Sequence, residues 1–337
     1  LHSSLTGQVE SGMPVIPGTP GTISTRRNQA KDEFFVHRYS DGANKPVERY
    51  IGLATDTDAV ERAAQTGRDI EEINAALADV RLLVRSGYQV ADKPSYVTLA
   101  TLHLHDLFQL GATLIGSHAF GVLTNQLGIR AEGYKTEDID VARREELALA
   151  NPVDFLDILK RTGINFVEVP RLKVKEPSTS FKEAGKSRLI VDLLAPSSND
   201  RIGLIPVPEL NAHAATLPYL AYLLGRTQMG LLLGTQGICP VRVPVPERFA
   251  IHKLIVSQLR EKRDAKVDKD IYQASVLLAG LAAIFPGAID EAVMEMPLSA
   301  ISKLKKGLAM AQRTYLAPYQ EALEEVTLAI SRREESK

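Results

Sequence analysis

The chain has 337 residues, of which 45% are hydrophobic and 24% are charged. These proportions are ordinary for soluble globular proteins and exclude a chain that is disordered throughout. The length favours two packed units, because single cores stop growing near roughly 250 to 300 residues. Forty basic and 41 acidic residues give a net charge of -1, which excludes a broad electrostatic attraction to nucleic acid or membrane surfaces but leaves a local basic patch open.

The cysteine content and the length of the apolar runs indicate in which cellular compartment the protein is expected. Cys239 is the only cysteine, so no internal disulfide can form and a thiolate metal cage is excluded. The apolar runs are far shorter than the roughly 20 residues that cross a bilayer. The N-terminus carries no basic region followed by an apolar stretch. We therefore expect a cytoplasmic protein without a membrane partner.

The N-terminal part predicts an arm followed by helices. Residues 1–33 are rich in Gly, Pro, Ser and Thr and have neither helical nor strand periodicity, which predicts a flexible arm. From Thr57, apolar residues recur three, four or six positions apart until Gly87, so a long amphipathic helix is expected over 57–86. A second apolar helix is predicted over 95–110.

The central part alternates helices with strands. The run 112–116 predicts a buried strand, 118–127 a helix that ends at Gly128, and 138–142 a half-buried strand. After a helix at 153–161, four stretches are rich in β-forming residues, namely 164–169, 178–183, 188–195 and 201–207. This order predicts a mixed sheet rather than repeated βαβ units.

The composition changes near Leu217, and the remaining chain is expected to be mainly helical. Segments 218–225, 247–263 and 269–285 predict helices. Because Pro318 interrupts the last periodic stretch, two helices or one kinked helix are expected there. We therefore predict an α/β (α+β) fold in three parts, which are the arm at 1–33, a core with N-terminal helices at 34–216, and a mainly helical C-terminal domain at 217–337.

Two acidic residues mark the strand at 138–142. Asp138 and Asp140 are two positions apart, so both side chains leave one face of the strand with Cα atoms roughly 6.5 to 7 Å apart. Paired carboxylates suit one or two Mg²⁺ ions and in-line phosphoryl transfer. An exposed strand end or a turn also explains most Asp-x-Asp pairs, so the pair alone is weak evidence.

Asp192 is a candidate third ligand. It sits within an apolar run, where an ionised group is costly unless it is paired or bound to a metal. Alternatively, it faces solvent from an alternating strand or pairs with a residue such as Arg188. Both interpretations stay open at this point.

Gly116 and Ser117 follow an apolar strand and open a helix, so bare backbone and unpaired N–H groups point at one place. Phosphate oxygens suit such a place, although a plain turn with a Ser cap is commoner. The order favours function: a Gly-Ser turn, then the Asp pair on a second strand, then Asp192 in a third.

These motifs resemble a known superfamily. LIGSHAF, LGIRAEGYKTEDIDVAR and RLIVDLLAP resemble the active-site motifs of polymerase β-type nucleotidyltransferases. The similarity is greatest to a largely uncharacterised bacterial family whose Asp pair reads DIDxA, and it spans roughly residues 34–285. The resemblance implies a polymerase β-like fold and Mg²⁺, or Mn²⁺ in its place, bound by Asp138, Asp140 and Asp192. The 20 residues between Ser117 and Asp138 exceed the spacing usual in the superfamily.

A later tract, HKLIVSQLREKRDAKVDKDIYQ, is more distantly similar to AbiEii-type toxin nucleotidyltransferases. The similarity implies that Lys253 contacts nucleotide phosphates and that Asp270 belongs to the same pocket, although Lys253 can equally be a solvated surface lysine. Arg260 and Arg263 are interpreted as surface residues, with contact to phosphate or to Asp270 as the alternative. His118 is expected to satisfy backbone groups, with contact to nucleotide as the alternative.

The hypothesis is therefore an Mg²⁺-dependent enzyme that moves NMP from an NTP such as ATP to an acceptor hydroxyl and releases pyrophosphate. Alternatives are an inactive nucleotide-binding or interaction module and an AbiEii-like toxin or antiphage component that acts on RNA. The sequence leaves open whether the acceptor is RNA such as tRNA, a protein or a small molecule. It also leaves the oligomeric state open.

Overall fold

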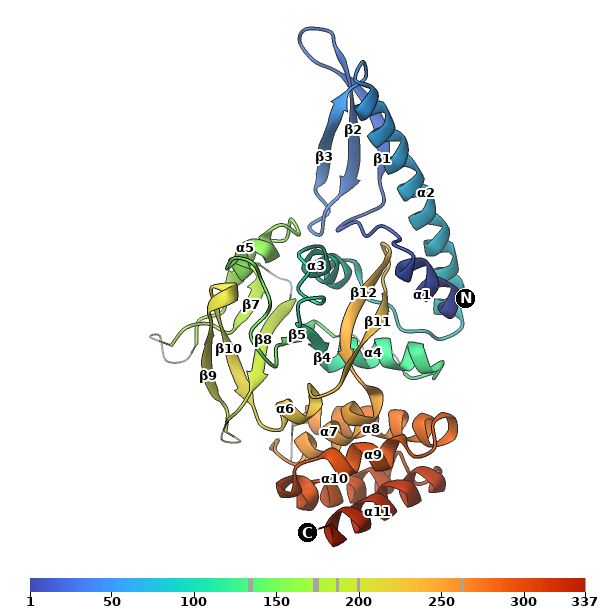
Figure 1. Ribbon diagram of the computed structural model, residues 1–337, viewed down its shortest axis with the longest axis vertical. Coiled ribbons are helices and arrows are strands. Elements are labelled where there is room, and N and C mark those ends of the chain that lie inside the picture. The colour runs from blue at the N-terminus through green and yellow to red at the C-terminus, as the bar shows by residue number, and fades with distance from the viewer. Residues whose placement is uncertain (133–135, 172–175, 186–187, 199–200, 262–263, 337) are drawn as a thin grey trace.

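A computed structural model describes residues 1–132, 136–171, 176–185, 188–198, 201–261 and 264–336. Figure 1 shows three regions along the long axis: a small sheet with a long helix at one end, a mixed sheet in the middle, and a group of helices at the other end. The described chain therefore combines strands and helices, with its last third mainly helical, as the sequence predicts for this fold class.

The N-terminal region is folded, so the prediction of a flexible arm is wrong for much of residues 1–33. A helix precedes three antiparallel strands in the order β1-β2-β3, and a long helix packs along them. The bounds are α1 His2–Glu10, β1 Thr22–Arg27, β2 Glu33–Ser40, β3 Pro46–Leu53 and α2 Thr57–Arg85.

Contacts with other parts of the chain explain why the local sequence pattern did not predict the N-terminal helix and strand. Leu5 of α1 is fully buried and Met13 nearly so, and both pack with apolar residues of α2 and of a hairpin more than 200 positions further along the chain. β1 is held by its pairing with β2. Short elements stabilised by such contacts carry little periodicity of their own.

Helix α2 matches its predicted span. Its N-cap is Asp56, whose carboxylate accepts a hydrogen bond from the backbone N–H of Asp58. The next helix, α3 (Lys93–Leu104), is capped by Asp92 in the same way. It ends earlier than predicted because the chain turns at Asp106, whose φ is 59°, a left-handed value that an α-helix does not accommodate.

The middle region is a seven-stranded mixed sheet, as predicted. Its main path runs β4-β5-β8-β10-β9, with β7 beside β8 and β6 beside β7. β8 pairs in parallel with β5 and β10 and antiparallel with β7. The bounds are β4 Thr113–Ile115, β5 Asp138–Ala142, β6 Phe166–Glu168, β7 Ser180–Glu183, β8 Ile190–Pro196, β9 Gly203–Val207 and β10 Ala212–Leu217.

Two helices lie with this sheet, α4 (Gly116–Leu127) directly after β4 and α5 (Phe155–Lys160) before β6. α4 ends at Gly128, whose φ of 67° is left-handed, as the sequence predicts for a glycine that stops a helix. The strand β10 was not predicted, because its residues AHAATL are mostly small and include only one β-branched side chain, that of Thr216.

The chain then forms a hairpin and a group of helices. The hairpin packs against β4, α3 and α4, while the helices pack on one another (Figure 1). Two separate helices flank Pro318, in agreement with one of the two predicted arrangements. The bounds are α6 Leu220–Leu223, β11 Thr227–Leu233, β12 Ile238–Pro244, α7 Pro246–Ser257, α8 Ala265–Ile284, α9 Ala288–Glu295, α10 Ile301–Thr314 and α11 Gln320–Glu335.

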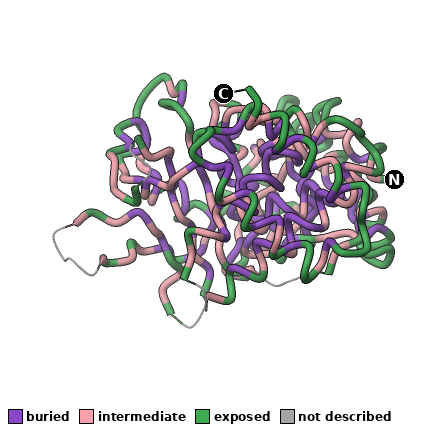
Figure 2. Tube along the Cα trace, turned by 90° about the horizontal axis from the view of Figure 1, so that it is seen from below, coloured by how far each residue is buried: buried purple, intermediate pink, exposed green. Residues whose placement is uncertain are grey.

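One hydrophobic core joins the middle sheet to the C-terminal helices. The buried cluster includes residues of α3, α4, β5 and β8 together with residues of α7 through α11, and Figure 2 shows the buried stretches gathered in the interior. Cys239 of β12 is fully buried within it. The domain boundary expected at residue 217 stays a prediction. Within the described residues, every helix is too short or too polar to span a bilayer.

Candidate active site

The strand register brings the predicted acidic residues together. β5 and β8 are parallel neighbours, and Asp140 lies directly opposite Asp192. Asp138 leaves the same face of β5 two positions earlier. The three carboxylate-bearing residues are partly exposed on this face, whereas Ile139 and Val191 on the other face are buried. The apolar run around Asp192 is therefore an alternating strand, and its polar face belongs to the site.

Gly116 closes the site from the side of β4. Its neighbour Ile115 pairs with Asp140, and Gly116 itself has a φ of 67°. A Cβ atom at this position would lie 2.0 Å from Oδ2 of Asp140, so the turn needs glycine for both its conformation and its clearance. Helix α4 begins here, so its N-terminal end, with Ser117 in the first turn, lies beside Asp140, and the partial positive charge of a helix N-terminus favours anions at this place.

Burial and the neighbouring negative charges raise the pKa values of Asp140 and Asp192. Burial, followed by the neighbouring Asp192, raises the pKa of Asp140 to about 6. Burial also raises the pKa of Asp192, and the negative charge of Asp138 adds to this, although a hydrogen bond with Ser180 opposes it. Negative charges held this closely are each stabilised by a cation between them.

The donor set fits a divalent cation, because three carboxylates supply the hard oxygen ligands that Mg²⁺ prefers. Among the described residues, no three His, Cys, Asp or Glu side chains are already gathered closely enough to enclose a metal ion. Asp138, Asp140 and Asp192 are the residues that would hold it, and the assignment stays a prediction.

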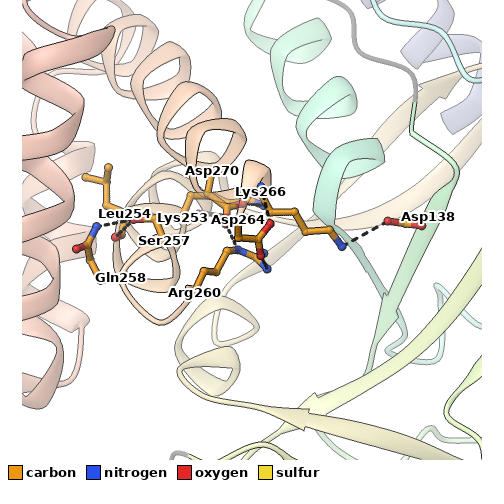
Figure 3. A network of polar contacts seen from close by, with 9 residues as sticks. All are labelled: Asp138, Lys253, Leu254, Ser257, Gln258, Arg260, Asp264, Lys266 and Asp270. Carbon is orange, nitrogen blue, oxygen red and sulfur yellow. Dashed lines mark hydrogen bonds and ion pairs between the residues drawn. The ribbon is translucent and has the colours of Figure 1, made fainter. Parts of the chain in front are cut away.

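The second half of the site comes from α7 and α8 (Figure 3). Nζ of Lys253 lies 2.6 Å from Oδ1 of Asp270, and Nε of Arg260 lies 2.6 Å from Oδ2 of the same residue. Asp270 is only 2% exposed. Burial alone would raise the pKa of Asp270, but the two cations hold it below its ordinary value. Of the two arginines interpreted as surface residues, Arg260 instead contacts Asp270, and Arg263 lies outside the described residues.

Asp270 is thus placed to orient Lys253 rather than to meet a phosphate itself, because both of its oxygens are already occupied by cations. Lys253 is close enough to lower the pKa of Asp140, which places its ammonium group on the carboxylate side of α7. The structure therefore brings Lys253 within electrostatic range of Asp140 and joins Asp270 to Lys253. Their contact with nucleotide stays a prediction.

Two further lysines lie here that sequence reasoning missed. Nζ of Lys266 lies 3.7 Å from Oδ2 of Asp138 (Figure 3). Burial, followed by the positive charge of Lys253, lowers the pKa of Lys269, while Asp138 and Asp140 oppose that shift. Lys266 and Lys269 are three positions apart at the start of α8, so they share one helix face. That spacing, immediately before Asp270, was the available signal.

His118 is enclosed in the first turn of α4. It is 9% exposed, and no described residue bonds its Nε2 atom. Burial lowers the pKa of His118 to about 4, so the ring is neutral at pH 7. The expectation that this histidine satisfies backbone groups is wrong for Nε2, and its contact with a ligand stays open.

The comparison with known families is decisive for identity. A protein-family model described as nucleotidyltransferase matches residues 98–297, a span that contains the Gly-Ser turn, all three site strands and helices α7 and α8. The chain belongs to this nucleotidyltransferase family. Its activity is accordingly nucleotidyl transfer, and a nucleotide is its substrate. Searches of curated proteins and of solved structures found no match.

Family membership confirms the superfamily predicted from the motifs, while the particular closeness to AbiEii-type toxins stays a prediction. The matched span leaves out β1, β2, β3 and α2 at one end and α10 and α11 at the other. This nucleotidyltransferase therefore carries its family's features on the middle sheet, the hairpin and the first C-terminal helices, which are the elements that build the site.

Proposed function

We propose that this nucleotidyltransferase transfers NMP from an Mg²⁺-bound NTP to an acceptor hydroxyl and releases pyrophosphate. The observation that carries the proposal is the register of β5 and β8, which sets Asp140 beside Asp192 directly next to the left-handed turn at Gly116. A cation held by the carboxylates would neutralise charge on the phosphates and steady the leaving pyrophosphate.

Backbone N–H groups and lysine side chains of the chain are proposed to bind the phosphates. The N–H groups at Gly116 and Ser117 are donors for phosphate oxygens at the start of α4. Lys253, Lys266 and Lys269 supply positive charge for the triphosphate from the opposite side. Lysines suit this task because an ammonium group acts as a compact point charge on phosphate.

Asp192 is the proposed acceptor of the proton that the attacking hydroxyl loses. A carboxylate held beside the attacking hydroxyl can accept its proton as a general base. Asp192 lies directly opposite Asp140 on the neighbouring strand, within the same group of carboxylates. The complete set of carboxylates argues against a module that kept the fold and lost turnover.

The test is label transfer. Purified protein is incubated with NTPs labelled at the α-phosphate, Mg²⁺ and cell extract, and the labelled product is identified by mass spectrometry. Asp138→Asn and Asp140→Asn should each lower transfer by at least about a thousandfold, because electrostatic stabilisation of the transition state is the largest catalytic contribution. Glu145→Gln, on a side chain that is 84% exposed, is the matched control.

Full transfer by folded Asp140→Asn protein would contradict the proposal. Absence of transfer by the wild type, with nucleotide bound, would instead support the inactive-module alternative. Label recovered on RNA would support the toxin-like alternative, and growth arrest on expression that Asp140→Asn relieves would support it independently.

A further inference from the structure

A pocket of about 730 Å³ opens beside helix α4, and no role has been given to it so far. Its volume falls within the range of small-molecule sites, roughly 300 to 1,000 Å³. The chain between α2 and α3 forms one wall, one face of α4 forms another, and the end of β11 completes it. The pocket is therefore built from three separate elements of the fold.

The pocket borders the candidate active site. Its lining includes Ser117 of the glycine turn, and Thr136 and Glu137, which directly precede Asp138. His118 lines it as well, and the charges of Asp138 and Lys269 both act on this ring. A molecule held here would lie beside the turn and the first carboxylate of the pair.

The charge of the lining is opposite to that of the nucleotide side. Asp92 and Glu137 contribute carboxylates, and the described lining contains neither lysine nor arginine. Lys253, Lys266 and Lys269 lie with α7 and α8 instead. A phosphate-rich molecule is repelled by such a lining, whereas a cationic group is attracted. The pocket is therefore unsuited to the triphosphate and to a nucleic-acid backbone.

His118 supplies an unused polar atom. The residue is nine-tenths buried, lines the pocket, and has no hydrogen-bond partner for Nε2 among the described residues. A buried polar atom without a hydrogen-bond partner is unfavourable. A ligand hydroxyl that bonds this nitrogen would remove the penalty, and the neutral ring leaves the negative character of the pocket intact.

We propose that this pocket binds the acceptor, and that the acceptor is a small molecule with both a hydroxyl and a protonated amino group. The inference rests on the proposed function. The acceptor oxygen forms a bond to the α-phosphorus, the bond from that phosphorus to the oxygen bridging to the β-phosphate breaks, and pyrophosphate leaves with the electron pair. The hydroxyl proton passes to Asp192 and then to solvent.

A matched pair of sugars tests the charge preference. A trimer of glucosamine and the corresponding trimer of glucose differ only in their amino groups, and each is titrated into the full chain by calorimetry. Saturating Mg²⁺ and a non-hydrolysable NTP occupy the carboxylate cluster during the titration, and a repeat without nucleotide follows. We expect the amino trimer to bind at least about tenfold more tightly at low ionic strength, because its ammonium groups can pair with the carboxylates of Asp92 and Glu137, and charge-assisted bonds are stronger than neutral ones.

Two variants test whether the preference for the amino trimer arises in this pocket. The double change Asp92→Asn with Glu137→Gln removes both charges, while asparagine still caps α3, and it should abolish the tenfold difference. Gly121→Leu fills the pocket from α4, since a Cβ there already meets Cβ of Gln89 at 3.2 Å, and it should weaken binding of the amino trimer. Glu145→Gln should leave the difference unchanged.

The outcomes separate this inference from the proposed function. Equal binding of the two trimers, or a preference that survives the double change, overturns the inference. Loss of NTP affinity in the double variant also overturns it, because the pocket would then serve the nucleotide. Transfer of label to RNA or protein, but not to the amino trimer, also overturns the inference. If the wild type binds no NTP, the proposed function fails, whereas an amino preference lost in the double variant still supports the pocket assignment.

Discussion

Asp140 is the residue on which the electrostatics of the site converge. Burial and the charges of Asp192 and Asp138 all disfavour its ionised form, and its pKa of about 6 results. In the unfolded chain a carboxyl of this type titrates near 3.8. Between these two values the folded state binds more protons, so the free energy of unfolding falls as the pH rises through this window.

Asp140→Asn should therefore stabilise the cation-free protein while it removes transfer activity. At pH 7.5 we expect the free energy of unfolding to rise by on the order of 2 kcal/mol, because the penalty of the buried charge disappears. Urea denaturation with EDTA present measures this. The gain should vanish near pH 4, where the wild-type carboxyl is protonated, and a loss of stability at pH 7.5 would contradict the expectation.

Asp270 illustrates the opposite situation, since its two cationic partners hold the pKa of Asp270 below its ordinary value. Asp270→Asn leaves Lys253 and Arg260 without their buried partner and should lower the free energy of unfolding by about 3 kcal/mol. The stabilisation should be fully present above about pH 4 and be lost as the pH falls below it. Denaturation curves at pH 7 and pH 3 measure the effect, with Glu72→Gln on the exposed face of α2 as the control.

At the scale of elements, one glycine lets two helices approach closely. Gly307 of α10 packs against α7, where an added Cβ would lie 2.4 Å from the carbonyl oxygen of Leu254. That residue follows Lys253 directly, so the position of the lysine depends on this helix contact. Helices packed this closely leave no room for even one methyl group.

Gly307→Ala should consequently lower both stability and nucleotide affinity. We expect a loss of about 1 to 3 kcal/mol in the free energy of unfolding, because overpacking displaces α10 from α7. Gly67→Ala in α2 is the matched control, since nothing lies within 4 Å of its added Cβ and alanine is favoured in helices by about 1 kcal/mol. The two variants should therefore shift the melting temperature in opposite directions, and two shifts of the same sign would refute the packing argument.

The elements predicted from sequence are those with strong patterns of their own. α2 has a long apolar period, β5 alternates between acidic and buried residues at its start, and β8 is an apolar run that a single acidic residue interrupts. α1 is held by residues far along the chain, β1 is held by its pairing with β2, and β10 consists largely of small side chains. Tertiary packing decides such segments, and a local pattern does not contain that information.

The site follows the same division. Asp138, Asp140, Asp192 and Gly116 were predictable because they sit on elements with clear patterns and in a known order. Their mutual register depends on the pairing of β5 with β8, and the contribution of Lys266 and Lys269 depends on how α8 lies relative to β5. Long-range docking of helices on a sheet fixes those contacts, so single-sequence reasoning found the acidic half of the site and missed most of the basic half.

At the scale of the whole molecule, the nucleotide site spans two regions that share one core. The carboxylates belong to the middle sheet, and the lysines belong to helices at its C-terminal side. A ligand that bonds both regions stabilises the folded state by mass action, by about 2.7 kcal/mol at a concentration one hundred times its Kd.

Mg²⁺ with a non-hydrolysable NTP should therefore raise the melting temperature, and neither component alone should have the same effect. Asp138→Asn should remove most of the rise because a ligand to the cation is lost. Scanning calorimetry at several ligand concentrations measures the shift, with Glu145→Gln as the control. An unchanged melting temperature at millimolar ligand would contradict a nucleotide site between these regions.

The enclosed sulfhydryl of Cys239 makes this protein convenient for probe-based experiments. Because the side chain is fully buried and burial raises the pKa of the thiol, alkylating reagents reach it only in molecules whose hairpin has opened. The rate at which Cys239 of the natural chain is alkylated therefore measures how often the hairpin opens. A second sulfhydryl introduced on the outside, as in Glu145→Cys, would take up a fluorophore against almost no background.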